Sequence, residues 1–177
     1  AKPENKKNIR RLISYYKDHI EKHPNITFIK ETADFDTIVA GHYNVCISAI
    51  GGNPRHLNVQ GIDNEMVINA MDYLDDVKVN GKEVVVIGGG ITGAETALEL
   101  HGEGKKVTII EMADQFLAQQ SNACQAYNIA ISQTDIKIKT GLRLLSVGDK
   151  EITLVDRFGN EQTMACDNVV IAAGFVS

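Results

Sequence analysis

Residues 83–93 read EVVVIGGGITG, and this stretch decides the fold. The aliphatic run up to Ile87 predicts a buried strand, and the pattern Gly88-x-Gly90-x-x-Gly93 follows it directly. Gly88 allows a tight turn, Gly90 lets the backbone approach a pyrophosphate, and Gly93 lets the following helix pack closely on the strand. The free amides at the start of that helix favour an anion. The stretch therefore predicts the phosphate-binding turn of a dinucleotide site.

The residues after this turn complete a strand-helix-strand unit. A helical pattern covers residues 94–103, and residues 106–111 predict a second strand. Such a unit has the length of a right-handed parallel crossover, so the fold class is α/β with a Rossmann-like parallel sheet. Glu111 ends the second strand, where a carboxylate can accept hydrogen bonds from both hydroxyls of an adenosine ribose.

The residues around Glu111 also bear on the choice of cofactor. A 2'-phosphate on the ribose would meet this carboxylate with no counter-charge in residues 112–115, so we expect NAD(H) to be preferred over NADP(H). S-adenosylmethionine enzymes share a glycine turn and a strand-end acid, but they seldom need the third glycine for helix packing. A structural glycine turn with a surface glutamate is the plainer alternative.

The rest of the chain divides near residue 79, where Asn80-Gly81 gives a turn signal. Residues 1–78 form the first region, and residues 79–177 form the nucleotide-binding domain. In the first region the apolar spacing predicts helices over 8–22 and 66–76 and strands over 26–29 and 43–50. In the second it predicts a helix over 122–133, a strand over 136–139, a hairpin meander over 143–147, 151–155 and 162–165, and a last strand over 169–173.

Composition and charge limit the partners. The 177 residues are 44% hydrophobic and 23% charged, typical of a globular protein, and their formal net charge of -5 repels nucleic acid. No apolar run reaches the roughly 18 to 20 residues that cross a bilayer, and residues 1–5 lack a signal-peptide core. We therefore expect a cytoplasmic protein without a membrane partner. Cys46, Cys124 and Cys166 lie far apart, so we expect buried apolar cysteines and no metal site.

These residues together resemble a known family. The stretch Val84–Glu95, the acid Glu111 and the final strand up to Gly174 look like the pyridine-nucleotide domain of flavoproteins with two dinucleotide domains. More narrowly, the chain resembles the C-terminal region of NADH:flavin oxidoreductases related to old yellow enzyme, which include dienoyl-CoA reductase, enoate reductase and trimethylamine dehydrogenase. Residues 48–51 and 60–63 match the linking segments of that family, so residues 1–78 resemble part of an FAD-type domain.

The resemblance implies cofactor contacts at particular residues. Glu95 matches a position near the nicotinamide half, although a helix-surface glutamate fits the pattern equally well. Gly51 matches a flavin-side turn, in which Ile50 replaces threonine. No catalytic residue or metal ligand is implied, because hydride transfer between two cofactors needs no protein acid. The cofactor contacts implied in the second region are Gly88, Gly90, Ile91, Thr92, Gly93, Glu111, Met112, Ala173 and Gly174.

The resemblance also implies that the chain is the NADH-binding portion of a larger enzyme. Hydride would pass from NADH to FAD and serve the reduction of an unsaturated enoate or dienoyl substrate elsewhere on the parent chain, where an FMN barrel and an iron-sulfur cluster are expected. On this interpretation the chain is an inactive fragment, and apolar surface exposed by truncation favours an oligomer. A structural ADP-binding module, as in trimethylamine dehydrogenase, is the alternative. A thiol-disulfide reductase would need a redox-active cysteine pair, which the sequence lacks.

Overall fold

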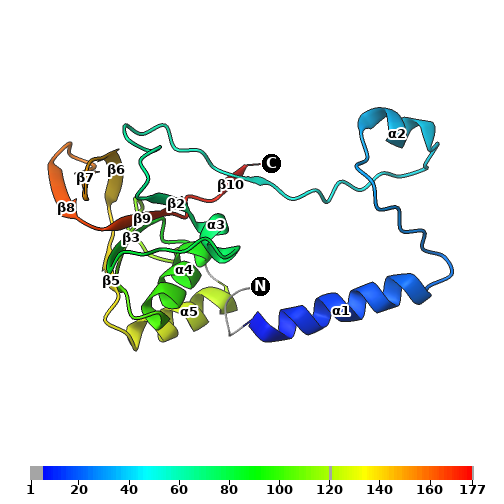
Figure 1. The fold of residues 1–177 in the computed structure, drawn as a ribbon, viewed down its shortest axis with the longest axis horizontal. Coiled ribbons are helices and arrows are strands. Elements are labelled where there is room, and N and C mark those ends of the chain that lie inside the picture. The colour runs from blue at the N-terminus through cyan, green and yellow to red at the C-terminus, as the bar shows by residue number, and fades with distance from the viewer. Residues whose placement is uncertain (1–5, 120, 177) are drawn as a thin grey trace. The chain divides into compact units, whose positions relative to one another are not determined.

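The computed structural model describes residues 6–119 and 121–176, and Figure 1 shows the order of their elements. The chain divides into two compact units between Gly52 and Asn53. This division differs from the boundary expected near residue 79, because residues 67–69 form a strand in the sheet of the second unit. Residues 53–78 therefore pack with the nucleotide-binding unit in the structure.

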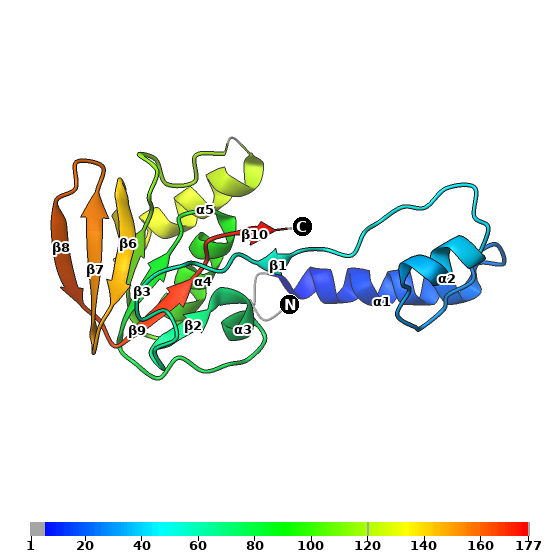
Figure 2. The ribbon, with the colours of Figure 1, turned by 90° about the horizontal axis from the view of Figure 1, so that it is seen from above.

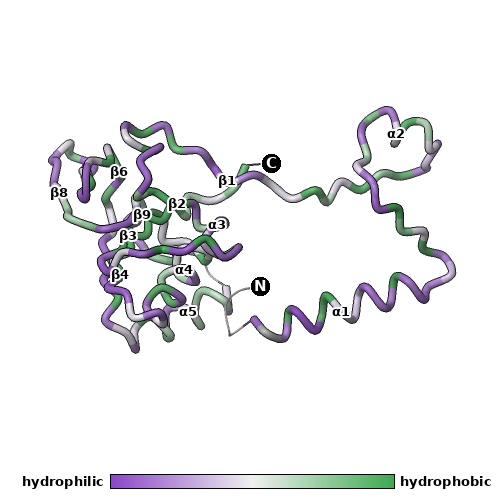
Figure 3. Tube along the Cα trace, in the orientation of Figure 1, coloured by the Kyte–Doolittle hydropathy of each residue, from purple (hydrophilic) through white to green (hydrophobic). Residues whose placement is uncertain are grey.

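The first unit contains two helices. The predicted amphipathic helix is confirmed as α1 (Lys7–Lys22), along which polar and apolar residues alternate in Figure 3. The second helix, α2 (Phe35–Ala40), was not predicted. It begins at Asp34, whose side chain accepts a hydrogen bond from the Thr37 amide at 2.8 Å and so caps the helix.

The two strands expected in this unit are absent from the structure. Residues 26–29 and 43–50 belong to no sheet of the described chain, and their side chains are exposed. A β-strand is stabilised by hydrogen bonds to a neighbouring strand, and no described strand pairs with either segment. The strand predictions are therefore wrong for this structure. Cys46, which lies in the second segment, is exposed rather than buried, whereas Cys124 and Cys166 are buried as predicted.

The second unit is built on a five-stranded sheet, which confirms the predicted α/β fold (Figure 2). All four pairs of neighbouring strands are parallel. In spatial order the strands are β2 (Val67–Asn69), β9 (Asn168–Ile171), β3 (Glu83–Ile87), β4 (Lys106–Ile110) and β5 (Lys137–Lys139). The helix expected over 66–76 is a strand followed by a short helix, because Val67–Asn69 pairs with the remote strand β9.

Three helices and a small antiparallel sheet cover the two faces of the large sheet. The side chains of β3 alternate, so that Val84 and Val86 face the helical layer, whereas Val85 and Ile87 face the meander. Both apolar clusters are fully buried at their centres. The covering elements are α3 (Ala70–Leu74), α4 (Ile91–Gly102) and α5 (Asn122–Ser132), and the meander β6 (Leu142–Val147), β7 (Glu151–Asp156) and β8 (Glu161–Ala165).

Two further contacts fix the ends of the central strands. Asp167 accepts hydrogen bonds from the amides of Lys82 at 2.7 Å and Glu83 at 2.9 Å, which ties the start of β9 to the start of β3. At the other end, β1 (Asn53–Pro54) pairs with β10 (Phe175–Val176) in a two-stranded antiparallel ribbon. No helix in the described ranges is long and apolar enough to cross a membrane.

Candidate dinucleotide-binding site

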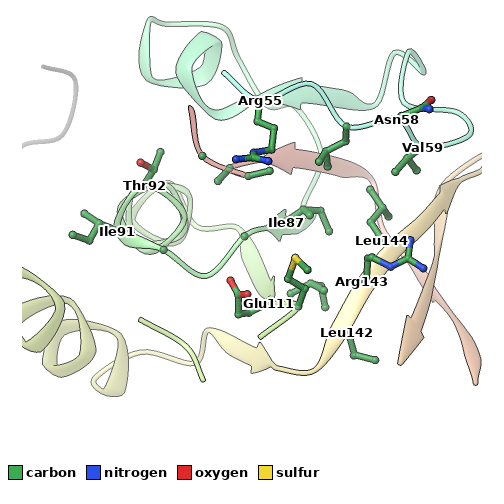
Figure 4. A pocket seen from close by; sticks show the side chains of 18 of the residues that line it. Arg55, Asn58, Val59, Ile87, Ile91, Thr92, Glu111, Leu142, Arg143 and Leu144 are labelled. Atoms are coloured by element: carbon green, nitrogen blue, oxygen red, sulfur yellow. The ribbon is translucent and has the colours of Figure 1, made fainter. Parts of the chain in front are cut away.

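A cavity of about 670 Å³ opens at the carboxyl ends of β3, β4 and β9, entirely within the second unit (Figure 4). This is the edge of an open parallel sheet at which ligands usually bind. The last residues of β3 and β4 and the residue after β9 line it. The lining residues are Arg55, Leu57, Asn58, Val59, Ile87, Gly88, Gly90, Ile91, Thr92, Ile110, Glu111, Met112, Gln119, Leu142, Arg143, Leu144, Ala172, Ala173 and Gly174.

The glycine turn between β3 and α4 forms one wall of the cavity. Gly88 has φ +114°, a conformation that side chains disfavour, and a Cβ atom there would collide with the carbonyl oxygen of Ala172. A Cβ atom on Gly93 would collide with the carbonyl oxygen of Gly88. A Cβ atom on Gly90 would instead enter open space, on the side where this residue lines the cavity. Two glycines thus serve close packing, and the third leaves room for a ligand.

Helix α4 presents its amino terminus to the same wall. Gly90 is its N-cap and has no side chain that could cap the first amides, and the first intrahelical bond runs from the Ala94 amide to the Gly90 carbonyl oxygen at 2.9 Å. Ile91 and Thr92, at the start of the helix, line the cavity. Unpaired amides and the positive end of the helix dipole favour an anion at this position.

Glu111 follows β4 and is fastened to the glycine turn by hydrogen bonds. Its Oε2 accepts from the Gly89 amide at 2.6 Å, and its Oε1 accepts from the Ala113 amide at 2.7 Å. Each carboxylate oxygen has a further lone pair that can accept from a ligand hydroxyl. The acid is therefore held in a single orientation at the cavity, with acceptor capacity left for a ribose.

The structure brings most of the expected cofactor contacts together. Met112, Ala173 and Gly174 line the cavity with the glycine turn, whereas Gly93 lies behind it in α4. Glu95 is also in α4, but it is buried and does not line the cavity. Gly51 belongs to the first unit, where it has φ +77°.

Sequence reasoning missed the wall opposite the glycine turn. This wall comes from the segment after β1 and from the start of β6, including Arg55, Leu57 and Arg143. The segment after β1 carried no periodic signal, and its position depends on the pairing of β1 with β10 more than a hundred residues away. No group of three or more potential metal ligands occurs in the part of the chain that the structure describes.

In sequence, the chain is similar to known oxidoreductases. The chain is 34% identical over 135 residues to a cinnamate reductase of Clostridium sporogenes, covering 73% of this chain and 20% of the relative. It is 32% identical over 150 residues to an NADH oxidase of Thermoanaerobacter brockii, covering 81% of this chain and 23% of the relative. The chain thus spans about a fifth to a quarter of the length of these relatives.

Solved structures and a family model extend the comparison to nearly the whole chain. A complex of 2-naphthoyl-CoA reductase with 2-naphthoyl-CoA superposes with a TM-score of 0.75 and 30% sequence identity, covering 93% of this chain and 25% of that one. The model of the pyridine nucleotide-disulphide oxidoreductases matches residues 4–177. With a Rossmann-like sheet, a glycine turn and a strand-end acid at one cavity, the chain belongs to the pyridine nucleotide-disulphide oxidoreductase family.

Proposed function

We propose that this chain binds NADH in the cavity and presents it to FAD in a larger flavin-dependent oxidoreductase. One observation carries the proposal: the open amino terminus of α4 and the fixed carboxylate of Glu111 face the same cavity. The first suits a pyrophosphate and the second suits the hydroxyls of the adenosine ribose. NADH supplies the hydride when bound, and the residues of this chain bind and orient it.

The proposed substrate class is an unsaturated acid or thioester that is reduced elsewhere on the parent protein. Similarity to a cinnamate reductase and to 2-naphthoyl-CoA reductase supports this class. The proposal places the chain near the dienoyl-CoA and enoate reductases, with the FMN barrel and the iron-sulfur cluster on other parts of the parent. It also assigns residues 1–78 to part of an FAD-type domain and its linker, of which residues 53–78 pack with the nucleotide-binding unit.

The proposed preference for NADH over NADPH rests on the orientation of Glu111. The two backbone amides hold the carboxylate beside the glycine turn, where it would repel a 2'-phosphate on the same ribose. Arg143 also lines the cavity, but Figure 4 shows its guanidinium directed away from Glu111. On this proposal the Glu111 carboxylate, held by the two amides, determines the choice between NADH and NADPH.

A structural ADP-binding module is the second candidate, and one observation favours it. The groups with clear ligand chemistry, the glycine turn and Glu111, match the adenosine diphosphate half. Glu95, the residue expected near the nicotinamide, does not line the cavity. Equal affinity for ADP and NADH would support the module. Tighter binding of NADH than of ADP, with the difference lost in Glu95→Gln, would support the reductase.

Calorimetric titration with NADH, NADPH and ADP tests the proposal. We expect NADH to bind at least about tenfold more tightly than NADPH, a difference of roughly 1.4 kcal/mol. Glu111→Gln should reduce this preference, because it removes the charge while its one amide oxygen can still accept from one of the two backbone amides. Glu111→Ala is a poorer test, since it releases the amides of both Gly89 and Ala113.

A pair of glycine variants tests the location of the site. Gly90→Ala would place a methyl group in the open cavity without a clash, so the fold should persist while affinity for NADH falls about tenfold or more. Gly102→Ala, at the other end of α4, also meets open space and should leave affinity unchanged. Unchanged binding in Gly90→Ala would place the nucleotide elsewhere.

A further inference from the structure

The wall that faces the glycine turn begins at Arg55. Pro54 pairs with Phe175 in the β1–β10 ribbon, and the Arg55 amide donates to the Gly174 carbonyl oxygen at 2.8 Å. Gly174 follows β9 and lines the cavity itself. The backbone of Arg55 is therefore fixed at the rim of the cavity, beside the end of the central strand.

The Arg55 side chain extends from this wall toward the start of α4. Arg55 and Thr92 together line both the main cavity and a small adjoining hollow, so they are neighbours across the rim. Figure 4 shows the guanidinium directed over the glycine turn on the Thr92 side, with Glu111 on the other side of the turn. A ligand that reached from Glu111 across the turn would arrive at Arg55.

The charges of the lining residues distinguish the two ends of the cavity. Arg143 comes from β6 beside the Glu111 end, where the Leu142 amide donates to the Glu111 carbonyl oxygen at 3.1 Å. Arg55 is the cation at the opposite end. No carboxylate of the described residues forms an ion pair with it, so its donors can serve a ligand. A guanidinium binds two phosphate oxygens at once through its planar fork of N–H groups.

We propose that Arg55 binds the second phosphate of the dinucleotide, the phosphate on the nicotinamide side. This inference rests on the proposed function, because it takes the adenosine ribose at Glu111 and the first phosphate at the start of α4. A pyrophosphate then spans from the glycine turn toward Arg55. The helix amides stabilise one phosphate, and the side chain stabilises the other from the facing wall.

Titration with ADP and AMP tests this assignment, because AMP ends at the first phosphate. We expect Arg55→Gln to weaken ADP binding about tenfold or more and to leave AMP binding within about twofold of the original protein. Arg55→Lys should recover part of the loss. Two controls remove the same charge: Arg143→Gln at the other end of the cavity and Arg157→Gln outside its lining, and neither should change the ADP-to-AMP affinity ratio.

The outcomes separate this inference from the proposed function. If the unsubstituted protein binds ADP and Arg55→Gln binds it equally well, the Arg55 assignment is wrong and the nucleotide site stands. Equal weakening of ADP and AMP would also overturn the assignment, because the contact would then be to the first phosphate or to the general charge. If the unsubstituted protein binds neither nucleotide, both proposals fail. Arg55 is exposed, so an unchanged melting temperature should accompany the substitution.

Discussion

The two units of the chain contain similar apolar sequence patterns, but they bury the apolar side chains to different extents. In the second unit Val86 and Ile109 are 0% exposed, because helices and a meander cover both faces of the sheet. In the first unit Ile13 is 47% exposed on α1, and Phe28 and Ile47 are 71% and 85% exposed. The difference teaches that periodicity selects residues for burial, but only a neighbouring element buries them.

The largest expected effect compares a buried and an exposed isoleucine. Ile109→Ala should lower the free energy of unfolding by about 2–5 kcal/mol, because it leaves a cavity in the centre of the sheet. Ile13→Ala should change it by less than about 0.5 kcal/mol. Urea unfolding followed by circular dichroism measures both. Similar losses in the two variants would show that the apolar face of α1 is covered in solution.

A smaller effect tests how tightly α4 packs against the glycine turn in the second unit. Gly93→Ala should destabilise this unit by about 1–3 kcal/mol, because the added Cβ meets the Gly88 carbonyl oxygen. Gly102→Ala is the matched control in the same helix, and it should stabilise the unit by up to about 1 kcal/mol since its Cβ meets nothing. Thermal unfolding of both variants gives the comparison. A neutral Gly93→Ala would mean that α4 can move away from β3.

The smallest expected effect concerns the free energy of unfolding at low pH. It compares one aspartate from each unit, Asp167 and Asp34. Backbone hydrogen bonds from Glu83 and Lys82 hold the pKa of Asp167 below its ordinary value of 3.8. The hydroxyl and amide of Thr37 likewise lower the pKa of Asp34. A lowered pKa contributes stability above the unfolded-state value, and this stability is lost as pH falls through the folded-state value.

The two aspartates should therefore differ in their effect on the sheet. Asp167→Asn should reduce the acid dependence of unfolding of the second unit between about pH 5 and pH 2, whereas Asp34→Asn should leave that transition unchanged. Melting curves monitored across this range measure the difference. An identical pH dependence in Asp167→Asn and the original protein would show that ionisation of Asp167, which accepts from the amides of Lys82 and Glu83, does not change the free energy of unfolding.

The sequence allowed prediction of the parts of the fold that depend on neighbours along the chain. The unit β3-α4-β4 and the meander have strong local patterns, and both are confirmed. Strand β2 was missed because its conformation depends on β9, about a hundred residues later. Helix α2 carried a usable local signal that was overlooked, since Asp34 is a favourable N-cap and bonds to Thr37 three residues on.

The same holds for the candidate site: residues placed by neighbouring elements could be predicted, and residues placed by distant segments could not. Gly88, Gly90 and Glu111 could be proposed from spacing, because each follows or ends a strand of one crossover. The hydrogen bond from Gly89 to Glu111 could not be predicted, since it depends on the turn's detailed geometry. Arg55 was not recognised because an antiparallel ribbon far along the chain places it at the cavity.

The central place of β9 has a consequence for biosynthesis. This strand lies between β2 and β3, yet it follows both of them by at least eighty residues in the chain. While the polypeptide emerges from the ribosome, β3, β4 and β5 can pair, but β2 has no partner until residues 168–171 appear. Such late, long-range closure slows folding and leaves apolar strand edges exposed to chaperones or to other nascent chains.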